Sequence, residues 1–457
     1  MNLVWAAILA GASLLWAADI DESAFFQDSS AAPAGAIPGQ GGRIKTDSVA
    51  TPVPAPSNSA DIGPKVTFSG DLYAVGQASW RRGAFDSATA SGSQLVGDAT
   101  VEARLPTGSR AMAIFEADQD AIGDSSEFHI REMFVDGNVD DGHLWIRAGK
   151  QVLQWGRGIL WTPTDLVNVE GKTLVPRAGP REGATGVRLQ VPLGEATNLY
   201  AFVNLADASV FDSISAAWRA ETVVGPAEVA LSGWNRMDAP TALGADGSTG
   251  FWGWDLQAGV LWLSGDIAPR PVLLDTSWEL ERDKNRQQVR AGGGIGRDVT
   301  VLGVPQRLRI DLEGFWQSDP IGSGVLKETA VHPWANPPST VPAALAGQVR
   351  TDEATYLFAQ GAYVPNQLSS AYIAGMATLQ QFLQQDLVLS VQALENLQDK
   401  SGLSTVGLSW TTFHRFSAQL TGYWFWGAPR TEEVLAGRGP ALEARMGVSF
   451  LAIRSGR

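Results

Sequence analysis

Histidine is the residue type in this chain most suited to acid–base catalysis, and four occur: His129, His143, His332 and His414. None lies in a motif such as HExxH or GxSxG, whose spacing places a metal or a nucleophile beside a base. Cysteine is absent, which excludes thiol catalysis, disulfides, Cys-ligated metals and a lipid-anchoring cysteine. A spatial pairing of one histidine with Ser or Asp stays open, but hydrogen-bonded histidines without a catalytic role are the expectation. We therefore predict no enzyme activity, no metal site and no cofactor.

An acidic segment, DQDAIGDSSE from Asp118 to Glu127, resembles part of a calcium-binding loop. Ile122 stands where such a loop has its third acidic or amide ligand, and Glu127 falls at the tenth position instead of the twelfth. A solvated acidic outer loop is therefore the expectation, and divalent-cation binding is the alternative.

The stretch Gly149–Asn168, GKQVLQWGRGILWTPTDLVN, concentrates side chains that need partners. Among them are Gln151, Trp155 and Arg157, and two glycines beside the arginine let the backbone turn around it. Thr162–Asp165 then reads as a turn or a helix start. One interpretation is an ordinary turn anchored by tryptophan. The other is an ordered loop folded back into a barrel, in which Trp155 packs against the wall while Arg157 and Asp165 make charge-assisted hydrogen bonds.

Most of the chain alternates apolar and polar residues with a period of two, the pattern of a β-strand. The pattern is found in nineteen segments, from 66–80 to the segment that ends at residue 451, and 272–281 and 356–364 are among them. Bacterial membrane barrels close with an even number of strands, so at least one segment is misassigned and we predict about 16–18 strands. The turns Pro192–Ala196 and Val224–Pro226 are short and predicted to be periplasmic. The longer pieces 81–93, 153–183, 237–249, 318–353 and 427–440 are predicted outer loops.

Composition favours strands that face lipid. Hydrophobic residues make up 44% of the chain and charged residues 18%, yet after residue 20 no run approaches the ~20 apolar residues of a membrane helix. Of the 17 tryptophans, eleven gather at segment ends, as in the interfacial girdles of a membrane barrel. The alternative is a soluble β protein that buries these aromatics in a core. We predict an all-β fold, a transmembrane antiparallel β-barrel.

The amino-terminal region differs from the rest. Residues 3–17 form a short apolar core followed by small residues, typical of a secretory signal cleaved near Ala17 or Ala18, although no Lys or Arg precedes it. A retained amino-terminal anchor is the alternative. We predict a signal peptide at 1–18, a disordered leader rich in Pro, Ala and Gly at 19–64, and a barrel at 65–457 in the bacterial outer membrane.

Charged residues recur on the polar faces of the strands. A charge on the lipid side near the membrane centre costs about 2–4 kcal/mol for Arg or Lys, so most of them must face inward. The predicted pore-lining or constriction residues are Glu102, Arg104, Glu116, Arg131, Arg147, Gln151, Trp155, Arg157 and Asp165. Acidic residues outnumber basic ones by 48 to 34, which argues against a nucleic-acid partner and predicts that an open pore would favour cations.

Four short motifs resemble those of uncharacterised porin-like outer-membrane proteins of bacteria: Arg131–Asp136, Arg147–Gln151, Trp155–Gly158 and Pro163–Asn168. That family has a strand like REAYVD, a strand like GRQ, a WGRG turn and a loop like NPTDLxN. Here Thr162 replaces Asn and Lys150 replaces Arg. The chain also ends in Arg457 instead of a terminal aromatic residue. The signal for barrel assembly would then have to come from Phe450 within the final strand. The resemblance covers about 40 residues, and it implies a barrel and a channel without a known substrate.

These patterns favour a pore that selects solutes by size and charge and carries out no covalent chemistry. We predict an outer-membrane porin-like channel for passive passage of small polar solutes or ions, with loop 153–183 narrowing the lumen. Its expected partners are outer-membrane lipid and the solutes, and its oligomeric state is open. The main alternative is a barrel whose lumen is plugged by 318–353 or by the leader, which serves as a structural or surface-assembly partner. A membrane-embedded hydrolase is a further alternative that a serine-reactive probe would test.

Overall fold

A computed structural model describes residues 65–80, 90–120, 125–139, 142–153, 155–168, 174, 180–205, 214–236, 240–322, 330–333, 350–412, 415–436 and 440–455. The predicted signal at 1–18 and the predicted leader at 19–64 lie outside these residues, as does His414.

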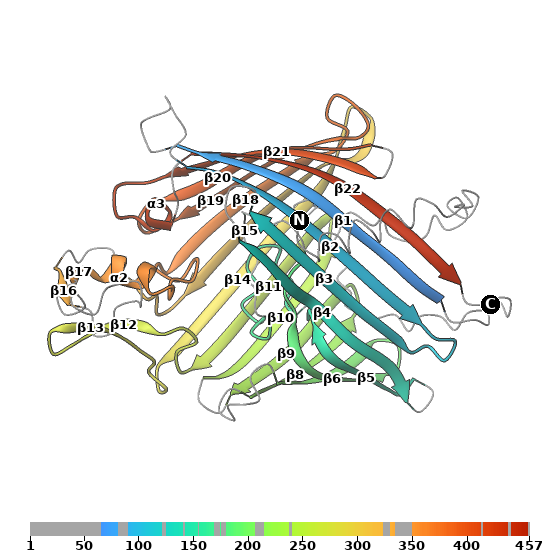
Figure 1. Cartoon of the computed structure of the whole chain (residues 1–457). Helices are drawn as coiled ribbons and strands as arrows, with labels where there is room; N and C mark the ends of the chain where they lie inside the picture. Colours follow the sequence, from blue (N-terminus) through green and yellow to red (C-terminus); the bar gives the residue numbers. More distant parts are fainter. Residues whose placement is uncertain are drawn as a thin grey trace.

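Eighteen strands form one closed antiparallel sheet (Figure 1). They are β1 (Lys65–Ser79), β2 (Ala90–Arg104), β3 (Arg110–Asp120), β4 (Ser126–Val139), β5 (Leu144–Gln151), β6 (Ala184–Leu193), β7 (Thr197–Asn204), β8 (Ser215–Val224), β9 (Ala227–Arg236), β10 (Thr241–Phe251), β11 (Trp254–Ser264), β14 (Gln287–Val301), β15 (Val304–Gln317), β18 (Ala371–Leu379), β19 (Leu387–Asn396), β20 (Gly402–Thr412), β21 (Phe416–Trp426) and β22 (Ala441–Ser455). Each pairs with the next along the chain, and β22 pairs with β1 from Lys65↔Ser455 to Ser79↔Ala441. The predicted antiparallel barrel is confirmed, with a strand number at the upper end of the predicted range.

Three segment assignments were wrong, and together they explain the odd number of predicted strands. Residues 272–281 fall in a separate hairpin, β12 (Arg270–Leu274) with β13 (Ser277–Glu281), and 356–364 overlaps helix α2 (Glu353–Ala359). Asp352 caps that helix by accepting a hydrogen bond from the Thr355 amide at 3.0 Å. Conversely, the predicted loop 237–249 contains most of β10, whose Gly, Ala, Ser and Asp residues weaken its apolar alternation. The predicted loop 81–93 likewise ends early, because β2 begins at Ala90.

The two faces of the sheet differ in polarity, as expected for a barrel in a membrane. On β9, Val229 and Leu231 point outward and are 42% and 58% exposed, whereas Ala230 and Ser232 between and beside them are each 4% exposed on the inner face. Exposed outward side chains of this kind recur around the barrel: Trp218, Leu243, Val260, Leu312, Trp410 and Trp424. The inner face instead carries buried charges: Arg219, Asp246, Asp311, Glu313 and Glu443. An apolar exterior around a polar interior is the arrangement of a transmembrane barrel and the reverse of a soluble sandwich.

The two ends of the barrel also differ. Short turns such as 194–196, 225–226, 252–253 and 302–303 lie at one end, where β1 begins and β22 ends. The longer connections lie at the other end, which we call the loop end (Figure 1). No helix among the described residues is long and apolar enough to cross a membrane.

Several connections pack together at the loop end and form what we call the cap, built from 265–286, 318–322, 350–370, 397–401 and 427–436. The Trp278 indole of β13 donates a hydrogen bond to the Thr351 carbonyl at 2.9 Å and stacks on Tyr356 of α2. Leu357 of α2 belongs to a small buried cluster against which Leu435 of helix α3 (Glu432–Ala436) packs. Apolar contacts therefore join connections that are far apart in the sequence.

Glu432 of α3 is the polar centre of the cap and is fully buried. Its carboxylate accepts hydrogen bonds from the Tyr372 hydroxyl at 2.6 Å, the Asn396 side-chain amide at 2.8 Å and the Tyr363 hydroxyl at 3.1 Å. Burial raises the pKa of Glu432 to about 7, because the charged form is poorly solvated there. Burial and the nearby carboxylate of Glu432 likewise raise the pKa of Glu433 to about 7.

Candidate functional site

The connection between β5 and β6 crosses the interior of the barrel. Its residues Leu160, Trp161 and Leu174 form a buried cluster with five side chains of the opposite wall: Tyr372 and Ala374 of β18, Leu394 of β19, Leu403 of β20 and Tyr423 of β21. These strands are far around the barrel from β5 and β6, so the loop must span the lumen to reach them. We call residues 152–183 the inward loop.

The inward loop is also packed where it leaves its own strands. Trp155 is 6% exposed and lies in a buried cluster with Leu153 and Val167 of the loop and with Phe202 of β7 and Ala217 of β8. The indole therefore lies against the near wall. This apolar contact holds the start of the loop close to β7 and β8 before the chain crosses to the far wall.

A local clamp shapes the base of the loop. Asn168 accepts a hydrogen bond from the Leu153 amide at 3.0 Å, and its own side-chain amide donates to the Asp165 carboxylate at 2.7 Å. The Asp165 amide donates to the Thr162 carbonyl at 3.0 Å and closes a turn. These bonds of Asp165 lie within the loop, and its role beside Arg157 in holding the loop inside the lumen stays a prediction.

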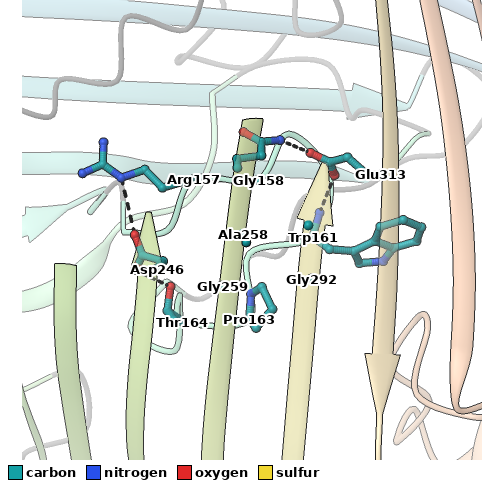
Figure 2. Close-up of a pocket in the computed structure, with 12 residues that line it drawn as sticks. Arg157, Gly158, Trp161, Pro163, Thr164, Asp246, Ala258, Gly259, Gly292 and Glu313 are labelled. Carbon is teal, nitrogen blue, oxygen red and sulfur yellow. Dashed lines mark hydrogen bonds and ion pairs between the residues drawn. The ribbon is translucent and has the colours of Figure 1, made fainter. Parts of the chain in front are cut away.

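Arg157 joins the loop to three wall carboxylates, and its side chain is 4% exposed. Its guanidinium forms ion pairs with Glu228 of β9, with Asp246 of β10 at 3.4 Å and with Glu221 of β8 at 3.8 Å. Asp246 also accepts two hydrogen bonds from Arg219, at 2.7 and 2.8 Å, and one from the Thr164 hydroxyl of the loop at 3.0 Å. Figure 2 shows Arg157 and Thr164 on either side of Asp246.

Glu313 of β15 holds the tip of the loop through its backbone. Its carboxylate accepts hydrogen bonds from the amides of Leu160 at 2.8 Å and Trp161 at 3.2 Å, and also from the Ile159 amide. The Gln257 side-chain amide of β11 donates to the same carboxylate. Three consecutive amides that meet one buried carboxylate fix the direction of the chain, because charged acceptors form strong hydrogen bonds.

A track of glycines lets the loop lie directly on the wall. A Cβ on Gly292 of β14 would come within 3.2 Å of Pro163 Cγ, and one on Gly244 of β10 would come within 2.8 Å of Thr164 Cγ2. Gly259 of β11 lies between these two strands and also faces Pro163 (Figure 2). Side chains at these positions would keep the loop away from the strands.

Glu116 and Arg131 form a second buried group near the end of the inward loop. Arg131 is the extra residue of a β-bulge in β4, and its Nε donates to the Glu116 carboxylate at 3.0 Å. Arg131 also lies 3.5 Å from Glu182, which accepts a hydrogen bond from Lys150 Nζ at 2.6 Å. That bond from Lys150 holds the pKa of Glu182 below its usual range. Gln151 lies beside this group, fully buried at the end of β5.

The remaining predicted residues lie apart from the inward loop, near the short-turn end. The Arg147 Nε of β5 donates to Asp136 of β4 at 2.9 Å, and Arg110 of β3 donates to the same carboxylate at 3.0 Å. Arg104 pairs with Glu102 at 2.9 Å, and its side chain is 56% exposed. The structure therefore divides the predicted set into residues that border the loop and a charged group below it.

Sequence reasoning missed several residues that hold the loop: Glu228, Asp246, Gln257, Gly244, Gly259 and Gly292. Alternation places Glu228 and Gln257 on an inner face but does not tell which of them the loop reaches, and Asp246 falls in the predicted outer loop 237–249. Glu221 and Glu313 lie on polar strand faces, but alternation alone gives them no role at the loop. Consecutive glycines at 292–294 are the one sequence signal for close approach of another segment to a strand.

No protein-family model matches the chain, and no curated protein matches it either. Solved structures of similar fold include three from Pseudomonas aeruginosa. OccK2 (OpdF) has 10% sequence identity and a TM-score of 0.51, OccK9 (OpdG) 10% and 0.50, and OccK5 (OpdH) 7% and 0.50. Each match covers 86% of this chain and 98% of the other. At such identities the similarity is one of fold, a barrel of comparable size and course.

Proposed function

We propose that this protein is an outer-membrane channel through which small polar solutes or ions pass passively. The observation that carries the proposal is the inward loop, anchored across a barrel whose outer face is apolar and whose inner face is charged. A closed barrel leaves no backbone group unpaired toward lipid, and its polar interior is the natural path for water and solutes.

Such a channel acts by selecting solutes according to their size and charge. The inward loop narrows the lumen, and the charged side chains that border it determine which solutes cross at low cost. Carboxylates predominate beside the loop: Glu221, Glu228 and Asp246 face Arg157 and Arg219, and Glu313 meets the backbone of the loop tip. This excess of negative charge supports preference for cations and for neutral polar solutes.

The location follows from the same arrangement. The barrel has long loops at one end, and short turns together with the start of β1 and the end of β22 at the other. This arrangement is typical of bacterial outer-membrane barrels, whose short turns lie on the periplasmic side. Export of such a protein requires a signal, which residues 1–18 provide in this proposal. The position of two motifs supports the resemblance to porin-like proteins, since Trp155–Gly158 and Pro163–Thr164 are among the parts of the loop that contact the wall.

Liposome swelling tests this function with solutes of graded size. Vesicles that contain the full chain should swell quickly in small sugars and amino acids and progressively more slowly as the solute grows. Vesicles with no more swelling than protein-free controls, for a chain shown to be inserted and folded, would refute the channel.

A barrel with a closed lumen is the second candidate, and the cap is the observation that favours it. Connections from four places in the sequence pack together at the loop end around Trp278 and Glu432. A packed cap at this end suits a structural or surface-assembly partner. Swelling assays separate the two candidates, because a barrel with a closed lumen should admit solute only after the cap has been removed.

A further inference from the structure

Three aromatic side chains and one arginine gather on the outer surface of the barrel near its short-turn end: Phe251, Trp252, Trp254 and Arg297. We call them the rim cluster. Phe251 ends β10, Trp252 lies in the turn and Trp254 begins β11. Arg297 lies in the part of β14 that continues beyond its last partner on β11, the pair Asp255↔Gly296. None of them borders the inward loop.

The outward direction of Arg297 follows from its neighbours. A Cβ on Gly294 would meet Glu313, and one on Gly296 would meet Arg309 and Asp311, so both glycines face the lumen. Alternation then places Ile295 and Arg297 on the outer face, and Ile295 is 37% exposed there. The Arg297 guanidinium lies over the Trp254 ring, 4.9 Å from its centroid.

Arg297 brings an uncompensated charge to this surface. Its neighbour Asp298 faces the lumen and lies 3.6 Å from Arg309. Within the part of the chain that the structure describes, no carboxylate forms an ion pair with Arg297. A cation on a lipid-facing wall is costly in the hydrocarbon layer but favourable at the level of phosphate headgroups.

Trp252 is unusual for its place in a turn. Trp252 and Gly253 have φ of 50° and 76°, the two left-handed residues of a hairpin turn that favours Asn, Asp or Gly at its first position. The indole is nonetheless 84% exposed and stacks on the outward Phe251 ring, with centroids 4.7 Å apart. Neither turn conformation nor packing within the chain favours tryptophan here, whereas the membrane interface does.

We propose that the rim cluster binds the headgroup of an anionic phospholipid in the leaflet at the short-turn end. Arg297 contacts the phosphodiester, and Trp252 and Trp254 lie at the headgroup level. The acyl chains run along Phe251 and Ile295, which continue into the apolar outer wall. The inference rests on the membrane placement in the proposed function and is independent of conduction through the lumen.

Lipid retention by the full chain tests the site. Delipidated protein is titrated with phosphatidylglycerol or phosphatidylcholine in detergent, and bound lipid is counted by native mass spectrometry. Arg297→Gln should weaken phosphatidylglycerol binding about fivefold, the factor equivalent to ~1 kcal/mol for one basic residue at an anionic surface. Phosphatidylcholine binding should fall less, because its choline group offsets the charge of the phosphodiester that Arg297 contacts. Trp252→Asn should weaken both lipids, although asparagine suits the turn better.

Leu302 offers a matched control, because it also has a positive φ of 52° in a two-residue turn and is 87% exposed, on the next hairpin. Leu302→Asn should retain lipid as the unsubstituted protein does. Equal loss in this control, or unchanged phosphatidylglycerol binding by folded Arg297→Gln, would overturn the proposal. Swelling assays on the same proteins report separately on the channel, so a failure of conduction leaves the lipid result intact and the reverse also holds.

Discussion

Arg157→Ala is the substitution that most strongly challenges the docking of the inward loop. The guanidinium is 4% exposed and pairs with Glu221, Glu228 and Asp246. Removal of one partner from a buried ion pair costs about 3–5 kcal/mol, because the remaining charges stay desolvated. Asp246 keeps its bonds from Arg219, so the lower part of that range applies here.

A loss of about 3 kcal/mol changes the ratio of docked to displaced loop by about a hundredfold. The barrel itself should remain folded, since none of its strand pairings involves Arg157. Single-channel recording should therefore show the Arg157→Ala protein in a state of higher conductance far more often than the unsubstituted protein. Cation preference should also rise, because one positive charge leaves a group of carboxylates.

Arg104→Ala is the matched control. It removes an arginine from the same barrel, but its pair with Glu102 is largely exposed and is worth about 0–1 kcal/mol. This variant should not release the loop, so it should enter the state of higher conductance no more often than the unsubstituted protein. Unchanged conductance in a folded Arg157→Ala protein would show that the loop lies outside the conducting path, and failure of that variant to fold would show that the loop is needed for the barrel.

Three further predictions test other contacts. Glu313→Gln should raise conductance as Arg157→Ala does, because one amide group replaces the charged acceptor of three backbone amides; a recording identical to the unsubstituted protein would contradict this. Gly292→Val should displace Pro163 and increase proteolytic cleavage within the loop, whereas loop protection equal to the unsubstituted protein would show that the wall yields. The cap should be tightest at acid pH: folding raises the pKa of Glu432 and Glu433 to about 7, so their protonated forms stabilise the cap fully below ~4.5 and this contribution is lost as pH rises through 7. Amide exchange of residues 427–436 should therefore be slower at pH 5 than at pH 8 after correction for intrinsic rates, and pH-independent protection would refute it.

Alternation of side chains made the barrel predictable, because lipid on one side and a polar lumen on the other impose the period-2 pattern on nearly every strand. The prediction was wrong where that pattern is blurred. The β10 sequence TALGADGSTGF places Ala and Gly on the outer face beside Leu243, so it resembles a loop. Conversely, 356–364 has apolar residues that serve a small cluster outside the barrel, where Asp352 starts a helix.

The site was only partly predictable for a related reason. Period-2 alternation tells which face a side chain occupies, but neither its angular position around the barrel nor its height relative to a loop. Arg157 and Trp155 stood out because they are unusual residues in a Gly-rich stretch. Their partners Asp246, Glu228 and Phe202 are ordinary members of distant strands. Only the closed sheet, with its particular register, brings them to the loop.

The most direct test of the account uses the absence of cysteine from the chain. Thr162→Cys introduces one thiol at the part of the inward loop that lies inside the barrel, with little change in side-chain size. If the loop narrows a conducting lumen, a bulky methanethiosulfonate reagent should reduce the single-channel current, and a reductant should restore it. A current that does not change after complete modification, verified by mass, would contradict the central claim that solutes pass beside this loop.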